Sequence, residues 1–126
     1  MFKIDSNKTI HITRGDIGTI EFSIMNGQNP YTFEVGDIVR FGVFNKKDMN
    51  SLIFQKDVEV NESATKVDIE LTSEETKIGD IINKPVDYWY EIQLNPDTEP
   101  QTIIGYDDLG AKVFKLYPEG IEATEW

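Results

Sequence analysis

Residues 87–91, Asp-Tyr-Trp-Tyr-Glu, place an indole ring between two carboxylates in a segment that alternates like a β-strand. Successive side chains of a strand point to opposite faces, so the two tyrosines, which share their parity with Ile92 and Leu94, should face the core. The opposite face then presents Asp87, Trp89, Glu91 and Gln93. Tryptophan is enriched at the energetic centres of protein interfaces, and its ring also stacks on sugars. These four residues are therefore candidate binding residues, unless the 96–110 segment of the same chain covers them.

The sequence contains few of the residues that act as nucleophiles or metal ligands. There is no cysteine, and the only histidine is His11. Thiol nucleophiles, thiolate metal sites and histidine metal clusters are thereby excluded, and any Ser-His-Asp arrangement would depend on His11. His11 lies between Ile10 and Ile12 in an alternating segment, which points it outward beside Thr9 and Thr13. We predict an ordinary surface histidine on a polar sheet face.

Carboxylates are abundant, and a pair separated by about 5–10 Å would suit glycoside hydrolysis. Two turn-like acidic segments, Asp97-Thr98-Glu99 and Asp107-Asp108, offer oxygen ligands for calcium, but neither has the spacing of an EF-hand loop. The sequence contains no phosphate-binding loop, dinucleotide-binding glycine fingerprint or zinc-protease motif. Acidic strand faces and turns are what solubility alone produces. The sequence therefore predicts no enzymatic activity, no cofactor and no metal site.

Arg14-Gly15-Asp16 spells a tripeptide that some cell-adhesion receptors recognise. A glycine between two polar residues, placed between two predicted strands, is also good turn chemistry. Because three residues match a motif by chance easily, we predict a turn at this position.

The charge of the chain is strongly acidic and unevenly distributed. The 126 residues carry a formal net charge of −11. Residues 1–56 hold seven Lys and Arg against six Asp and Glu, a net of +1, whereas residues 57–126 hold five against seventeen, a net of −12. Nucleic acid is excluded as a ligand, because phosphate binding depends on clustered Lys and Arg. An acidic surface promotes solubility and suits a partner with a basic patch.

Compartment and membrane signals point to a protein that folds in the cytoplasm. The absence of cysteine fits a reducing environment. No run of 18 apolar residues occurs, and residues 1–7 lack the apolar stretch of a signal peptide. We expect no membrane insertion.

Alternation with period two dominates the chain and predicts strands with one buried face. In the 51–60 segment, Leu52, Phe54, Val58 and Val60 share one parity. The last strand turns either Val113 and Tyr117 or Phe114 and Leu116 inward. The predicted strands cover residues 9–13, 18–25, 38–44, 51–60, 66–71, 86–95 and 112–117, with a further extended piece at 31–33.

One segment has a helix-start signal. In 72–75, Thr-Ser-Glu-Glu, the Thr72 hydroxyl can accept from the first-turn amides while Glu75 reaches back to the Thr72 amide. Gly79 would end the helix. We predict one short helical turn near residues 73–78.

Seven or eight short strands with turn signals every 8–12 residues predict an all-β fold. The expected architecture is an antiparallel β-sandwich, immunoglobulin-like, with a small closed barrel as the alternative. No linker, low-complexity tract or repeat interrupts the chain, so we expect a single β-sandwich domain over residues 1–126.

Four stretches of this sequence together resemble a known family. They are ITRGDIGTIEF at 12–22, YTF at 31–33, GDIVRF at 36–41 and YWYEIQL at 88–94. This succession resembles the N-terminal domain of phage upper baseplate proteins and related small prophage tail structural proteins of Gram-positive bacteria. The likeness covers about residues 9–117 and consists of similar turn motifs and alternating strand segments in the same order.

The resemblance implies a β-sandwich that anchors or assembles in a tail tip or baseplate, without enzymatic activity. The implied partners are other phage tail or baseplate proteins and further copies of the chain, and the implied location is the bacterial cytoplasm during assembly, then the virion tail. Family members are often longer, and this sequence ends at Trp126, so we expect a small accessory or connecting component. Lys46, Lys47 and Lys56 lie where they would protect strand edges. A carbohydrate-binding β-sandwich for host-surface recognition is the alternative function.

Overall fold

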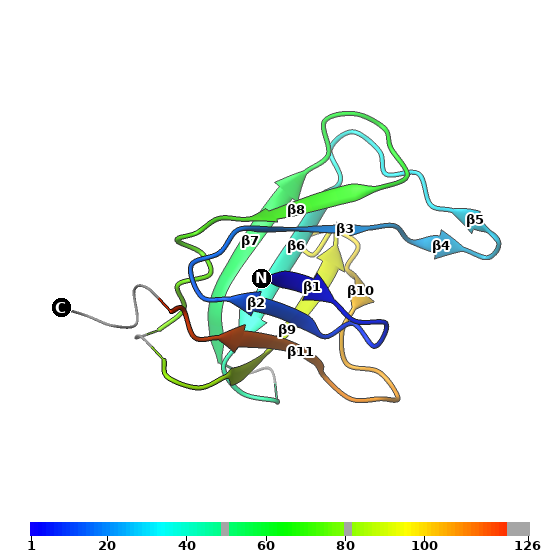
Figure 1. The fold of residues 1–126 in the computed structure, drawn as a ribbon. Coiled ribbons are helices and arrows are strands. Elements are labelled where there is room, and N and C mark those ends of the chain that lie inside the picture. Colours follow the sequence, from blue (N-terminus) through cyan, green and yellow to red (C-terminus); the bar gives the residue numbers. More distant parts are fainter. Residues whose placement is uncertain (49–50, 80–81, 121–126) are drawn as a thin grey trace.

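A computed structural model describes residues 1–48, 51–79 and 82–120 of the chain (Figure 1). The described residues form eleven strands and no helix. The strands are β1 (Phe2–Ile4), β2 (Ile10–Thr13), β3 (Gly18–Phe22), β4 (Met25–Asn26), β5 (Asn29–Pro30), β6 (Ile38–Phe44), β7 (Leu52–Glu59), β8 (Val67–Leu71), β9 (Val86–Leu94), β10 (Gln101–Ile104) and β11 (Lys112–Tyr117).

Seven of these strands form one large sheet in the order β1-β2-β11-β9-β6-β7, with β10 paired to β9 beside β11. All neighbours in the sheet run antiparallel except β2 and β11, which are parallel. The strand β9 is the centre of the sheet, because its first half pairs with β11, its second half with β10, and its other edge with β6.

A second, two-stranded sheet of β3 and β8 crosses one face of the large sheet, and the β4–β5 hairpin projects beside it (Figure 1). Side chains from both sheets form one hydrophobic core. Its fully enclosed members are Ile10, Ile12, Phe33, Val39, Phe41, Val43, Ile69, Ile92, Phe114 and Leu116. The fold is thus all-β with mostly antiparallel pairing, as predicted, and the packing of two sheets is that of a β-sandwich.

The alternation in the sequence fixes which face each strand buries. In β9 the buried residues are Tyr88, Tyr90, Ile92 and Leu94. In β11 the two alternatives left open by the sequence are resolved, because Phe114 and Leu116 are fully buried while Val113 and Tyr117 are only partly so. These side chains leave the large sheet on the same face as the buried side chains of β6, and they form one core with the buried side chains of β8.

The strand β7 departs from its predicted parity at Leu52. Phe54 and Val58 pack against the core as expected, but Leu52 is exposed. The register explains the difference: Val43 pairs with Phe54 and Phe44 pairs with Leu52, so Ile53 is an extra residue in β7. Such a bulge turns every residue beyond it to the other face, which sends Leu52 outward.

Three short elements were missed by the sequence analysis. They are β1, the β4–β5 hairpin and β10. Each has at most four residues, too few to show a period. Each is held by pairing with a longer neighbour or with its own hairpin partner.

The short helical turn predicted near residues 73–78 is not helical; the segment forms a hydrogen-bonded turn over residues 73–76. Its two reciprocal bonds are the predicted ones: the Thr72 amide donates to Glu75 Oε1 at 2.9 Å, and the Glu75 amide donates to Thr72 Oγ1 at 3.2 Å. Burial alone would raise the pKa of Glu75, but the hydrogen bonds from Thr72 and Lys56 outweigh it and hold that pKa below its ordinary value.

This turn docks on the Arg14-Gly15-Asp16 segment and closes one end of the sandwich. Asp16 N donates to Thr13 O at 2.9 Å, and Gly15 has φ +88°, so the tripeptide forms the predicted turn. The fully buried hydroxyl of Thr76 donates to Asp16 O at 2.7 Å and accepts from Gly15 N at 3.1 Å.

Arg14 is buried in the same corner rather than displayed. Its Nη1 donates to Glu119 Oε1 at 2.6 Å, its Nη2 to Gly79 O at 2.7 Å and its Nε to Ile78 O at 3.3 Å. The two charged side chains are only 9% and 10% exposed. A receptor that reads an exposed Arg-Gly-Asp tripeptide would therefore not find this arginine accessible.

Glu119→Ala should destabilise the fold by about 3 kcal/mol, because it leaves the Arg14 guanidinium buried without its carboxylate. Urea unfolding followed by circular dichroism measures the loss. The matched control is Glu21→Ala, which breaks the exposed Lys66–Glu21 pair and should cost less than about 1 kcal/mol. Equal losses in the two variants would contradict the proposed difference between the pairs.

Candidate functional site

The outward face of β9 carries all four of the candidate binding residues predicted from the sequence. Asp87 is exposed, and Trp89, Glu91 and Gln93 are half-buried on the side opposite the core. The predicted direction of these side chains is thus confirmed. The 96–110 segment was also considered from the sequence as a cover for these residues. Part of that segment, β10, pairs with β9 beside Glu91 and Gln93.

Three rows of side chains cross this face from β7 through β6 to β9. In the first row Asp57, Arg40 and Gln93 are neighbours. In the second row Gln55, Gly42 and Glu91 are neighbours. In the third row Leu52, Phe44 and Trp89 are neighbours. The middle position of the middle row is therefore occupied by a glycine, with a hydrogen atom where its neighbours have side chains.

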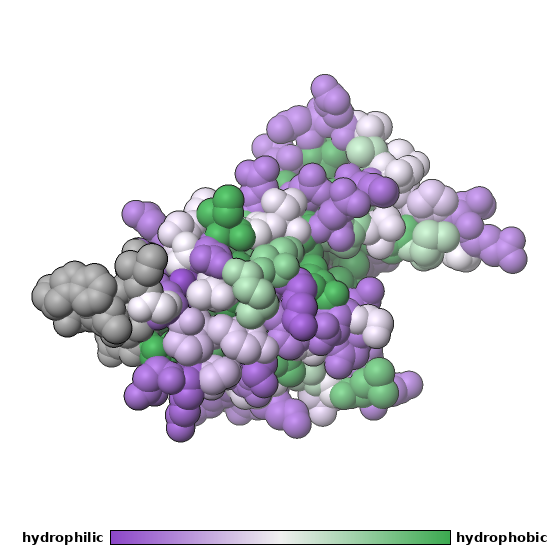
Figure 2. All heavy atoms as spheres, in the orientation of Figure 1, coloured by the Kyte–Doolittle hydropathy of each residue, from purple (hydrophilic) through white to green (hydrophobic). Residues whose placement is uncertain are grey.

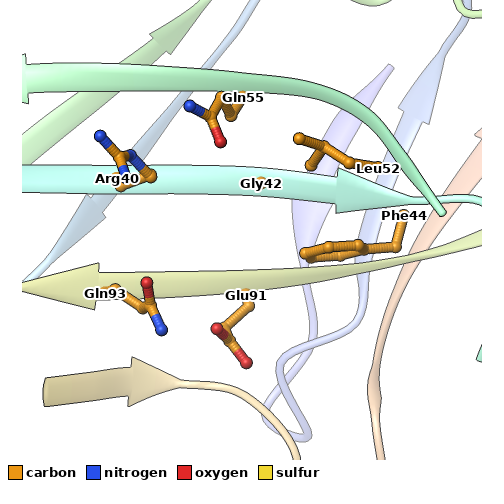
Figure 3. Close-up of a pocket in the computed structure, with 7 residues that line it drawn as sticks. All are labelled: Arg40, Gly42, Phe44, Leu52, Gln55, Glu91 and Gln93. Atoms are coloured by element: carbon orange, nitrogen blue, oxygen red, sulfur yellow. The ribbon is translucent and has the colours of Figure 1, made fainter. Parts of the chain in front are cut away.

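The missing side chain at Gly42 leaves a hollow of about 170 Å³ in the sheet face (Figure 3). Its lining consists of Arg40, Gly42, Phe44, Leu52, Gln55, Glu91 and Gln93. Figure 3 shows the polar groups of Gln55, Glu91 and Gln93 around the bare stretch of β6, with Phe44 and Leu52 together at one end. Trp89 stands beyond Phe44 in the third row and is not part of the lining.

The one cation of the hollow is already paired within the chain. Arg40 donates to both carboxylate oxygens of Asp57, at 2.8 and 3.0 Å, and to those of Asp97, at 3.3 and 3.1 Å. The hydrogen bonds to Asp57, then those to Asp97, raise the pKa of Arg40 above its ordinary value. The bond from Arg40 in turn lowers the pKa of Asp57. Asp97, considered from the sequence as a calcium ligand, thus belongs to an ion-pair network.

Glu91 is the opposite case, a carboxylate without a partner. Burial raises its pKa above the ordinary 4.5, and no hydrogen bond or ion pair joins it to the described part of the chain. The covering comes from the residues around β10, since a Cβ built at Gly105 would lie only 3.2 Å from Glu91 Oε2 and 2.6 Å from Thr102 Cγ2. The side-chain amides of Gln55 and Gln93 likewise have no hydrogen-bond partner among the described residues.

His11 lies on the outward face of β2, as predicted, but it is not an ordinary surface residue. Its side chain is only 13% exposed. Its Nε2 is 2.7 Å from Asp5 Oδ2, and its Nδ1 is 2.7 Å from Tyr117 Oη. Through these contacts His11 joins Asp5, in the β1–β2 connection, to Tyr117 of β11. The contact with Tyr117 spans 106 positions and could not be predicted from the sequence.

Among the other acidic candidates, Asp107 also has structural partners. Asp107 Oδ1 accepts from the Leu109 amide at 2.9 Å and from Lys112 Nζ at 2.7 Å, so it organises the turn before β11. In the described ranges no group of three or more His, Cys, Asp and Glu side chains is arranged to hold a metal ion. The same ranges contain no helix with the length and apolar character needed to cross a membrane.

Sequence reasoning found the β9 side of the hollow and missed the β6 and β7 sides. One signal was present: a glycine inside the alternating segment 38–44, where a strand gains nothing from it. Interior glycines of strands often mark the close approach of a ligand or another backbone, and Gly42 is the floor of the hollow.

Comparison with known proteins gave no match among protein-family models, curated proteins or solved structures.

Glu91→Gln should stabilise the protein at pH 7 by about 0.5 kcal/mol, the scale of a surface substitution. The folded-state pKa of Glu91 is raised, so the charged carboxylate costs stability above that pKa, and the cost disappears as the pH falls below 4.5. Thermal unfolding from pH 3.5 to 7.5 should therefore show wild type and variant converging at acidic pH.

The matched control is Glu62→Gln, which removes one charge from an exposed position. Its difference from wild type should be small and should not follow the same pH course. A Glu91→Gln variant less stable than wild type at pH 7 would show that the carboxylate has a stabilising partner.

Proposed function

We propose that this chain is a non-enzymatic structural component of a bacteriophage or prophage tail, assembled into a baseplate or tail tip. It binds other tail proteins through the outward face of β6, β7 and β9, folds in the bacterial cytoplasm, and ends in the virion tail. The observation that carries the proposal is the hollow around Gly42, in which Gln55, Glu91 and Gln93 have no side-chain hydrogen-bond partner among the described residues and Phe44 and Leu52 form an apolar end.

The rim has the composition of an interface. Leu52 is 52% exposed, and Phe44 and Trp89 stand beside it in one cross-strand row. Aromatic residues surrounded by polar groups are typical of the centre of protein interfaces. Elsewhere the visible surface is largely hydrophilic, with separate small hydrophobic patches (Figure 2).

The order of the strands supports the immunoglobulin-like part of the proposal. In immunoglobulin sandwiches the sheet of strands C, F and G, to which variable domains add C′ and C″, faces a sheet in which strands B and E are neighbours. Here β7, β6, β9 and β11 are consecutive neighbours in the large sheet, and β3 pairs with β8 in the small one. The resemblance of residues 9–117 to baseplate proteins agrees with such a scaffold.

A carbohydrate-binding module is the second candidate, and the lining of the same hollow favours it. The amides of Gln55 and Gln93 and the carboxylate of Glu91 are planar groups that can each bond two hydroxyls, and Phe44 offers a ring for the apolar face of a sugar. This function predicts sugar-dependent quenching of tryptophan fluorescence, whereas the assembly function predicts none.

If the chain is an assembly component, it should co-elute with tail proteins encoded beside its gene in a complex well above its own 14.4 kDa. Light scattering on a sizing column, across a concentration series, measures the mass. Trp89→Ala should weaken the complex at least about tenfold, the loss typical of a buried aromatic anchor. Glu62→Ala, at an exposed position away from the three rows, is the control and should leave the complex unchanged.

A chain that stays monomeric at every concentration and binds none of those tail proteins would contradict the assembly function. Quenching by sugars in that sample would favour the carbohydrate-binding module.

A further inference from the structure

We propose that the hollow around Gly42 receives an arginine side chain of a different tail protein, with Glu91 as the carboxylate that pairs with its guanidinium group. This inference rests on the proposed assembly function and names the chemistry by which the partner is recognised. The steps concern charge, shape and the source of the arginine.

The charges around this hollow favour a cation over an anion or a neutral group. Arg40 is surrounded by Asp57 and Asp97, which together more than neutralise it. Glu91 adds a third carboxylate on the other side of Gly42, and no cation of the described chain pairs with it. The hollow and its border therefore carry three acids and one base. A partly desolvated carboxylate gains most from a cation that arrives with its own hydrogen-bond donors.

The polar lining matches a guanidinium better than an ammonium. A guanidinium is planar and has five donors, two of which fit a carboxylate side by side. The carbonyl oxygens of Gln55 and Gln93, which accept no hydrogen bond from the described residues, are available for the remaining donors. An ammonium has three donors and no plane, so it would leave more of these acceptors unmet.

The apolar end of the hollow matches the rest of an arginine side chain. Phe44 and Leu52 lie together at the end of β6, where they can contact the methylene groups, and an aromatic ring also attracts the guanidinium plane. Gly42 supplies the depth. A Cβ there would lie 3.4 Å from the Phe44 ring and 3.5 Å from Leu52 Cδ1, which is ordinary contact, so a larger side chain would fill the space without a severe clash with these neighbours.

A second copy of the chain does not provide the arginine. The sequence contains two arginines, Arg14 and Arg40. Arg14 is buried against Glu119, and Arg40 is held by Asp57 and Asp97. The partner is therefore a different protein, with an arginine that projects from its surface.

The test uses n-butylguanidinium as the probe, added to the ¹⁵N- and ¹³C-labelled protein and followed by NMR. We expect a saturable shift of the Glu91 side-chain carboxyl signal and of the Gly42, Gln55 and Gln93 amides. The dissociation constant should be on the order of 10 mM, the range for so small a ligand. n-Butylammonium at the same ionic strength should bind several-fold more weakly.

Two variants separate the hollow from the general acidity of the protein. Glu91→Gln removes the carboxylate, and Gly42→Val fills the hollow; each should weaken guanidinium binding at least about tenfold. The control Glu62→Gln removes one exposed charge and should leave the affinity unchanged. The amide spectra of the variants report whether the fold is intact.

Shifts scattered over the acidic surface, or an unchanged affinity in Glu91→Gln, would overturn the arginine site. A neutral sugar such as glucose that shifts the same amides, while guanidinium does not, would also overturn it and assign the hollow to a carbohydrate. The probe is independent of any tail protein. Failure of the co-elution experiment with intact guanidinium binding would therefore reject the assembly role alone.

Discussion

The register of β9 is the constraint on which the rest of this structure depends. Its nine residues pair with β11, β10 and β6 at once, so its position fixes three neighbours in the large sheet. Its tyrosines and aliphatic residues fill the core, while its tryptophan, glutamate and glutamine are placed in the cross-strand rows of the opposite face. A slip of one residue would exchange the two faces, burying carboxylates and exposing Tyr90, and no compensation elsewhere would offset that.

The ends of the sandwich are closed by polar contacts, not by additional core. At one end the turn after β8 docks on the Arg14 turn, and the buried Arg14–Glu119 pair joins β2 to the segment after β11. At the other, Asp37 accepts from the Glu34 amide, from Asn95 Nδ2 and from the Tyr31 hydroxyl. Burial would raise the pKa of Asp37, but these hydrogen bonds outweigh it and lower that pKa. Polar groups that the fold must bury are thus satisfied: among the described residues, no buried side-chain nitrogen or oxygen atom lacks a hydrogen-bond partner.

Local patterns predicted what depends on local chemistry. The parity of β9, the turn at Gly15 and the reciprocal bonds between Thr72 and Glu75 each involve residues close in sequence, and all are present. Features that depend on distant residues were not predictable. Arg14 finds Glu119 across 105 positions, and His11 finds Tyr117 across 106.

The hollow belongs to the second group, because it exists only where three strands align. Gln55, Gly42 and Glu91 are neighbours through two separate registers, and the bulge at Ile53 decides that Leu52 joins them on the outward face. Strict alternation places Leu52 inward, because no residue type in 51–60 indicates a β-bulge. The interior glycine was the one local signal. It indicates that something approaches the backbone, but the identity of the neighbours comes from the sheet.

The partly desolvated carboxylate of Glu91, on the proposed binding face, costs stability in the free chain and favours association with a cation. A half-buried carboxylate without a cation is a poor choice for a domain selected only to be stable, and the same position becomes favourable when a partner supplies the charge. A single contact of this size is weak. In a baseplate or tail tip, where a component is present in several copies, each weak contact raises the effective concentration at the next. The proposed role and the modest hollow are therefore compatible: repetition supplies the strength, and the charge and shape of each hollow supply the specificity.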